Sequence, residues 1–283
     1  MTRWRWSTRL RWSNGIALAL SASLVASVAS ASRPDTLRVC ADPNNLPFSN
    51  ARGQGFENVL ATMLAEHLDA RLEYTWWAHR RGFLRHTLAA GACDVVMGVP
   101  PGLPLVDTTR PYYQSRYVFV TQRARRLHLR SIDDARLSRL RVGVQMVGDD
   151  FANSPPAHAL STRGVITNVR GFSVLGDYAQ PNPPARIVDA VAQGTIDVAL
   201  VWGPLAGYFA ARQPVPLDLR LVAADADTPD RPLTFAIAMA VRRHETARRQ
   251  QLEGFLTRRR AAIDRVLDSY GVPRVDRPHG GRW

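Results

Sequence analysis

The stretch Leu37-Arg38-Val39-Cys40-Ala41 is a short apolar strand sequence, and its first three residues return 103 positions later as Leu140-Arg141-Val142. A second group repeats at the same offset: Gly91, Asp94, Val95 and Pro101 return as Gly194, Asp197, Val198 and Pro204. Each copy opens with a strand and continues with a helix, a glycine that ends the helix, and an aspartate before an apolar run. Two groups of matches at one offset predict two lobes of similar construction.

The elements expected around these repeats alternate between strand and helix. In the first lobe we expect strands at residues 37–41, 72–76 and 94–99, with helices at 56–68 and 83–89 between them. In the second lobe we expect strands at 141–145, 165–170 and 196–201, with Pro183-Pro184 opening the helix before the last strand. This alternation predicts an α/β fold with a mostly parallel sheet, flanked by helices, in each lobe.

Two connections are expected between the lobes. The first is the arginine-rich segment 121–139, in which Ser131-Ile132-Asp133-Asp134 resembles a capped helix start. The second is a strand at 235–241, followed by one helix over 246–270 that ends at Gly271-Val272-Pro273.

These connections define the predicted lobes. Lobe one consists of residues 32–121 plus 236–283, and lobe two, residues 122–235, is inserted in it. Two lobes with two hinge crossovers predict a hinged clamshell, whose ligand cleft faces the carboxyl ends of the strands.

The first 31 residues have the features of a secretory signal peptide. Four arginines and no acidic residue precede an apolar run at 16–28, and Ala29-Ser30-Ala31 is a small-residue cleavage site. Cys40 lies past the apolar run, and Arg38 stands where a lipid-attachment motif needs a small residue, so we expect no stable membrane anchor. No later apolar stretch is long enough to span a bilayer. We therefore expect export to the periplasm.

The chain is strongly basic, with a formal net charge of +13, and all 37 of its basic side chains are arginines. Without the predicted signal peptide the charge is +9. The lack of lysine excludes Schiff-base and P-loop chemistry. Arg258-Arg259-Arg260 fits a solvated helix face, and export argues against a nucleic-acid partner. A basic surface can steer an acidic protein partner.

Two cysteines, Cys40 and Cys93, remain after export to an oxidising compartment. A disulfide is the default interpretation there, and two free buried thiols are the alternative. They form neither a CxxC redox pair nor a zinc site.

The candidate ligand residues follow the predicted strands, where a cleft would lie. Their aromatic, amide and charged groups suit a polar or flat ligand. The set is Asp42, Asn45, Trp77, Arg81, Tyr112, Gln145, Asp149 and Trp202. The alternative for any single member is a structural role in the core or in a turn.

Catalytic and metal-binding signatures are weak. Gly53-Gln54-Gly55 is followed by Asn58 where a dinucleotide-binding loop needs glycine. The pairs Asp133-Asp134 and Asp149-Asp150 could chelate a metal, but helix capping is the simpler interpretation. We expect no catalytic residue, no cofactor and no metal.

Long motifs resemble one known family. They include LRVCADPNNLPFSN at 37–50, CDVVMGVP at 93–100, VGDDFANSPPAHAL at 147–160 and IDVALVWGPLAGYFA at 196–210. Together they resemble the MxaJ/XoxJ family of quinoprotein-dehydrogenase-associated binding proteins, within the type II periplasmic solute-binding proteins. The resemblance implies a non-catalytic periplasmic accessory that assists maturation or activation of a pyrroloquinoline-quinone methanol dehydrogenase. That dehydrogenase and its cytochrome c are the implied partners.

The amino-acid-binding relatives differ at the ligand-gripping positions. Where they carry an arginine after the third strand, alignment on Pro111-Tyr112-Tyr113 places Gly102, and Val147-Gly148 replaces their Gly-Ser/Thr. Trp202 stands where they hold the ammonium group with an aspartate. A zwitterion would be desolvated here without partners, so we expect no binding of ordinary amino acids.

Two alternatives to the accessory function remain. One is a receptor of an ABC importer for a small non-amino-acid solute, since fold alone does not decide. The other is an enzyme on this scaffold, which needs a general acid in the cleft. Its nearest carboxylates, at Asp42, Asp149, Asp150 and Glu57, form no convincing catalytic set.

Overall fold

The computed structural model describes residues 35–146, 154–173, 180–223 and 232–275. The predicted signal peptide lies outside these residues, as do Asp149 and Asp150. Among the described residues, no helix is both long and apolar enough to cross a membrane.

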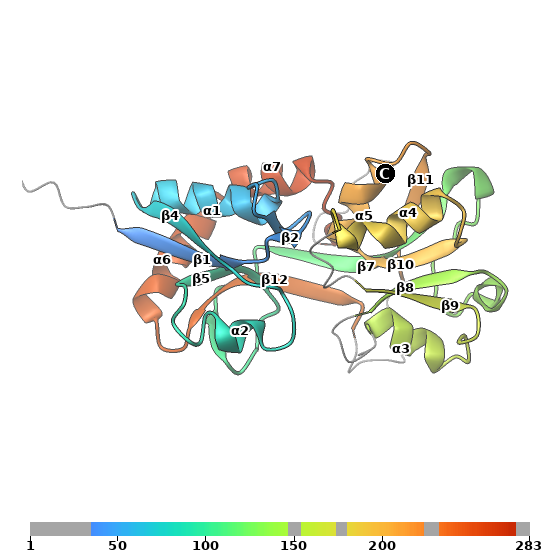
Figure 1. Ribbon diagram of the computed structural model, residues 1–283, viewed down its shortest axis with the longest axis horizontal. Coiled ribbons are helices and arrows are strands. Elements are labelled where there is room, and N and C mark those ends of the chain that lie inside the picture. Colours follow the sequence, from blue (N-terminus) through green and yellow to red (C-terminus); the bar gives the residue numbers. More distant parts are fainter. Residues whose placement is uncertain (1–34, 147–153, 174–179, 224–231, 276–283) are drawn as a thin grey trace, which may run out of the picture. The chain divides into compact units, whose positions relative to one another are not determined.

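Ten strands form one mixed sheet in two halves, with the parallel strand pairs inside each half (Figure 1). The first half contains β1 (Thr36–Ala41), β4 (Arg71–Trp76), β5 (Val95–Val99) and β6 (Val106–Thr108). The second half contains β8 (Val142–Met146), β9 (Val169–Ser173), β10 (Val198–Trp202) and β11 (Leu217–Leu221). The long antiparallel strands β7 (Tyr113–Gln122) and β12 (Thr234–Arg242) pair with each other and join the halves. A separate small ribbon pairs β2 (Asn44–Asn45) with β3 (Ser49–Asn50).

Helices cover both faces of each half (Figure 1). The first half carries α1 (Phe56–His67), α2 (Phe83–His86), α6 (Thr246–Arg258) and α7 (Arg260–Ser269). The second half carries α3 (Pro155–Ser161), α4 (Arg186–Ala192) and α5 (Gly203–Ala210). Three short 3-10 turns complete the described elements: η1 (Arg123–Arg125), η2 (Ala135–Ser138) and η3 (Pro183–Ala185). This is the predicted α/β architecture; the exact lobe boundaries stay a prediction.

The sequence repeat is also a repeat of strand register. In the first half Val39 faces Val95 and Cys40 faces Val96 across parallel strands β1 and β5. In the second half Val142 faces Val198 and Gly143 faces Ala199 across β8 and β10, at the same offset of 103. The repeated residues therefore occupy equivalent positions in the two halves.

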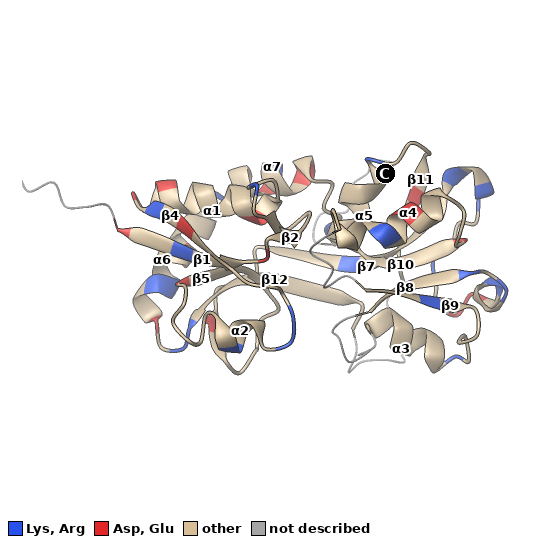
Figure 2. Cartoon of the chain, in the orientation of Figure 1, with Lys and Arg blue, Asp and Glu red and all other residues tan. Residues whose placement is uncertain are grey.

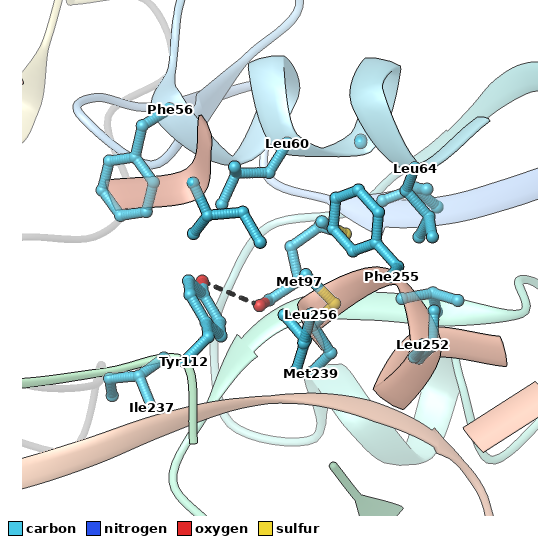
Figure 3. Close-up of a cluster of buried hydrophobic side chains, with 14 of the residues drawn as sticks. Phe56, Leu60, Leu64, Met97, Tyr112, Ile237, Met239, Leu252, Phe255 and Leu256 are labelled. Atoms are coloured by element: carbon cyan, nitrogen blue, oxygen red, sulfur yellow. Dashed lines mark hydrogen bonds between the residues drawn. The ribbon is translucent and has the colours of Figure 1, made fainter. Parts of the chain in front are cut away.

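The largest apolar cluster lies between the first half of the sheet and helices α1, α6 and α7 (Figure 3). Phe56, Leu60 and Leu64 of α1 contribute to it, and each is fully buried. On the second half, one cluster lies beneath α4 and α5 and another beneath α3 and η2. Each half thus buries its own core, which is what a two-lobed sequence pattern predicts.

Several predicted elements differ from the structure. The helix expected over 246–270 is two helices, because Arg259 leaves the helical region at φ −106° and ψ 11°. Buried apolar residues recur at helical spacing on both sides of Arg259, so the sequence pattern does not reveal the break. The helix start at Ser131–Asp134 leads only to the 3-10 turn η2, for which Asp134 is the N-cap.

The strand expected at 165–170 begins later, at Val169. Gly164 takes the left-handed conformation at φ +73°, and the Val165 N–H donates to the Leu160 carbonyl. Val165 therefore closes helix α3 instead of opening a strand. The sequence pattern also gives no prediction for β7, the long strand that starts at Tyr113.

Candidate ligand cavity

A cavity of about 240 Å³ lies at the carboxyl ends of β1, β5 and β10. Its wall is largely aromatic and apolar, from Phe48, Phe83, Tyr113, Trp202 and Ile237. Its polar side chains include Asp42, Asn45, Ser49, Glu57 and His79. The position fits the general rule that α/β folds bind ligands beyond the carboxyl ends of the strands. Of the sequence-predicted residues, Asp42, Asn45 and Trp202 meet in this wall.

Asp42 is a buried side chain that holds the loop after β1 in place. One carboxylate oxygen accepts the Asn44 N–H at 2.7 Å, and the other accepts the His79 N–H at 2.7 Å. The first bond forms a tight turn, and the second fixes the segment after β4 against the end of β1. Asp42 therefore shapes the cavity rim by positioning backbone.

Trp202 is the last residue of β10 and brings the second half of the sheet to the cavity. Its ring packs edge-on against Tyr117 and Phe235, with centroids 5.4 and 5.8 Å apart. Its backbone N–H donates to Gln145 Oε1 at 2.6 Å. Gln145 is buried and lies behind the cavity wall, so it positions Trp202 from outside the lining.

Tyr112 lies in the hydrophobic core and not in the cavity wall (Figure 3). Its hydroxyl donates to the Met97 carbonyl at 3.0 Å, and only 1% of the residue is exposed. The following residue, Tyr113, lines the cavity instead. Successive side chains in extended chain point to opposite faces, so the prediction was displaced by one residue.

The remaining predicted residues lie elsewhere. Trp77 is 47% exposed and stacks on His86, with ring centroids 6.0 Å apart, outside the cavity wall. Arg81 is also an exposed residue outside that wall. Asp149 lies outside the described residues. The predicted set is thus divided between the cavity, the core and the surface.

Glu57 is a cavity residue outside the predicted ligand set. It lies in the first turn of α1, and its carboxylate packs so closely over Gly98 of β5 that a Cβ on Gly98 would collide with it. Burial raises the pKa of Glu57 to about 8. The sequence signal was a glycine inside an apolar strand, which indicates close approach by another group.

Gly102, the residue that the sequence comparison predicts at the position of the carboxylate-gripping arginine of amino-acid-binding relatives, has φ +84°. This left-handed conformation favours glycine and would strain an arginine side chain at that site. The local backbone thus agrees with the expected loss of the carboxylate clamp. The described residues also contain no cluster of three or more His, Cys, Asp and Glu side chains suited to a metal ion.

Cys40 and Cys93 form a disulfide, with Cα atoms 5.6 Å apart. The bond joins β1 to the residues before β5, and Cys40 also contributes to the cavity wall. The interpretation as free thiols is thereby excluded.

Comparison with known proteins first defines the class. No family model matches the chain. The fold is that of the periplasmic binding proteins and is shared with type II solute-binding proteins. The crystal structure of MxaJ from Methylophaga aminisulfidivorans superimposes with a TM-score of 0.74 at 28% identity, covering 85% of this chain and 100% of that one.

The particular family follows from closer similarity. Protein MoxJ of Methylorubrum extorquens is 32% identical over 254 residues, which cover 87% of this chain and 84% of MoxJ. The crystal structure of the periplasmic binding protein XoxJ from Methylobacterium extorquens is 32% identical, with a TM-score of 0.69, and is covered over 99% of its length. The chain belongs to the MoxJ/XoxJ/MxaJ family of periplasmic binding proteins.

Proposed function

We propose that this protein is a non-catalytic periplasmic accessory of a pyrroloquinoline-quinone methanol dehydrogenase. In this role it docks on the dehydrogenase or on its cytochrome c and assists maturation or activation. The observation that carries the proposal is the 32% sequence identity between this chain and MoxJ over most of both chains. The signal peptide at 1–31 and the release of residues 32–283 into the periplasm are part of the same proposal.

The cavity supports a function other than amino-acid uptake. Gly102 and Trp202 stand where amino-acid receptors place their charged clamps, and neither side chain can pair a zwitterion. Asp42, Asn45 and Trp202 remain the proposed ligand contacts from the predicted set. A calorimetric titration with the common amino acids should show no micromolar binding, and such binding would contradict this part of the proposal.

The docking face is not marked by charge alone. Basic segments are spread over both halves of the sheet and several helices (Figure 2). We expect them to accelerate association with an acidic partner, an effect that weakens as salt screens the charges.

The experiment is a binding assay between the tagged, exported protein and purified methanol dehydrogenase or its cytochrome c, at low and moderate salt. The matched control is a tagged amino-acid-binding protein of the same fold. A saturable complex with near-stoichiometric yield, absent for the control, supports docking. In cells lacking this protein, dehydrogenase activity should fall while dehydrogenase abundance stays constant.

No complex at either salt, with normal dehydrogenase activity in the deletion strain, would overturn the proposal. The importer receptor for a small non-amino-acid solute then becomes the better account, because the fold and the 240 Å³ cavity suit it equally.

A further inference from the structure

Glu57 is an unpartnered acid at the wall of the cavity. Its side chain packs over Gly98 and has neither a hydrogen bond nor an ion pair with another residue in the described part of the chain. The neighbouring acid differs, since both Asp42 oxygens accept backbone N–H groups. Glu57 is partly buried, and a carboxylate that is partly removed from water without a partner is less stable than a hydrated one. An incoming counter-ion would relieve part of that cost.

The surroundings of Glu57 favour a cation over other ligands. Phe48, Tyr113 and Trp202 contribute aromatic surface to the same cavity, and aromatic faces attract organic cations. Neither arginine nor lysine lines the cavity within the described residues, so no guanidinium or lysine ammonium group there would attract an anion. The cavity therefore combines a largely apolar and aromatic wall with two carboxyl groups and the polar side chains of Asn45, Ser49 and His79.

We propose that the cavity binds a small organic monocation, with an ammonium or guanidinium group beside Glu57 and an apolar body against the aromatic wall. The volume of about 240 Å³ limits the ligand to a small molecule. The absence of a carboxylate clamp at Gly102 separates this ligand from an amino acid. The inference does not depend on docking to the dehydrogenase, because it concerns the isolated protein.

Binding of such a cation should be coupled to proton release from Glu57. The groups that face Glu57 are Tyr74 of β4, Tyr112 and Tyr113 around the start of β7, and the cavity residues Asp42 and His79. Burial, with a smaller contribution from Glu57, raises the pKa of all three tyrosines, which therefore stay neutral near pH 7. Since the pKa of Glu57 is about 8, a cation that needs the carboxylate binds more tightly as the pH rises towards 8.

The test is isothermal titration of the exported protein with benzylammonium, benzyl alcohol and benzoate, which share one apolar body and differ in charge. We expect benzylammonium to bind at least about tenfold more tightly than the alcohol, and benzoate not to bind. Benzyltrimethylammonium, whose charge is independent of pH, should gain close to tenfold in affinity per pH unit from pH 6 to 7.5.

The Glu57→Gln variant should lose both the preference for the cation and the pH dependence. Glu66→Gln is the matched control, because Glu66 is an exposed residue on the same helix. Thermal unfolding of each variant checks that it is folded. Equal affinity for amine and alcohol, no binding of any probe at millimolar concentration, or an unchanged pH dependence in folded Glu57→Gln would overturn the inference.

Discussion

The two halves of the sheet are held by the same arginine–aspartate clamp. In the first half, the Arg38 backbone N–H and guanidinium donate to Asp94, and a further guanidinium N–H reaches the Gly91 carbonyl. In the second half, Arg141 makes the corresponding bonds to Asp197 and to the Gly194 carbonyl. The residues that repeat in the sequence are thus the ones that fasten the first strand of each half to the start of a later one.

The two clamps differ in how strongly nearby arginines stabilise the ionised aspartate. Hydrogen bonds from Arg141 hold the pKa of Asp197 well below its ordinary value, and Arg125 adds a second ion pair. Burial opposes the ionisation of Asp94, but hydrogen bonds from Arg38 still lower its pKa. Each aspartate has a second arginine nearby, but Arg125 forms a hydrogen bond with Asp197, whereas Arg242 lies 3.9 Å from Asp94.

A second difference concerns the residue next to each clamp. Cys40 and Cys93 form the disulfide in the first half, and at an offset of 103 the equivalent residues are Gly143 and Ile196. A Cβ on Gly143 would meet Ile196 Cδ1 at 2.5 Å, so the isoleucine packs directly over the glycine. The clamp is thus common to both halves, whereas the neighbouring pair of residues forms a disulfide in one half and an apolar contact in the other.

Removing the covalent link should have the largest effect. The double variant Cys40→Ala/Cys93→Ala opens a loop with a sequence separation of 53 and should lose about 4 kcal/mol of unfolding free energy. Urea denaturation of the wild type with and without reductant measures the same quantity independently. The double variant Cys40→Gly/Cys93→Ile introduces the residues that the second half carries at these positions. Its apolar packing should recover part of the lost unfolding free energy. A loss below about 1 kcal/mol would show that the disulfide is dispensable.

The converse change should add a link to the second half. In the double variant Gly143→Cys/Ile196→Cys, the register shared with Cys40 and Cys93 should bring the new thiols within bonding reach. We expect a gain of about 2 kcal/mol after some loss of apolar packing. A thiol count on the unfolded, unreduced variant should give none, and two free thiols would show that the halves are not equivalent at this site.

The positions of β1, β5, β8 and β10 could be predicted because both clamps and their apolar strands leave a local signature. The cavity could be predicted only in part. Asp42, Asn45 and Trp202 follow strand ends, which a sequence pattern locates well. Glu57 reaches the cavity from a helix through its close approach to Gly98, and such tertiary contact has no fixed spacing in the sequence.

The errors in the fold have related causes. Strand β7 escaped prediction because its first residues alternate between buried and partly exposed, whereas its later residues are continuously buried. Tyr112 and Tyr113 are adjacent aromatics that are both buried, and only the strand's phase decides which one lines the cavity. Phase is set by pairing with β12, a strand more than 100 residues away.

Neutralising the aspartate of each clamp should show which of the two ion pairs contributes more to the free energy of unfolding. Asp197→Asn should cost about 2 kcal/mol at pH 7 and Asp94→Asn about 1 kcal/mol, both kept small by solvent around the exposed guanidinium groups. An aspartate whose pKa is lowered in the folded protein stabilises the fold at pH values above its ordinary pKa of about 4. That stabilisation is lost as the pH falls below this value towards the lowered pKa.

Urea midpoints at pH 7 and pH 3 provide the measurement for both clamp variants. The difference between Asp197→Asn and the wild type should shrink at pH 3. Asp218→Asn is the control for the loss of an ion pair elsewhere, because Asp218 pairs with Arg220 outside both clamps. Equal costs for the two clamps would mean that Arg125 stabilises the second clamp no more than the more distant Arg242 stabilises the first.

The smallest expected effect concerns the residues after the clamped strands, Asp42 and Gln145, which are again 103 positions apart. Both side chains accept hydrogen bonds from backbone N–H groups, and the one that Gln145 accepts comes from Trp202 in the cavity wall. Gln145→Leu leaves that N–H without its acceptor and should cost about 1 kcal/mol. Because Trp202 then loses its anchor, its fluorescence emission should shift, and the shift should vanish in a Trp202→Phe background. Gln145→Glu keeps an acceptor oxygen and serves as the control. If Gln145→Leu left both stability and emission unchanged, the cavity wall would be positioned by aromatic packing alone.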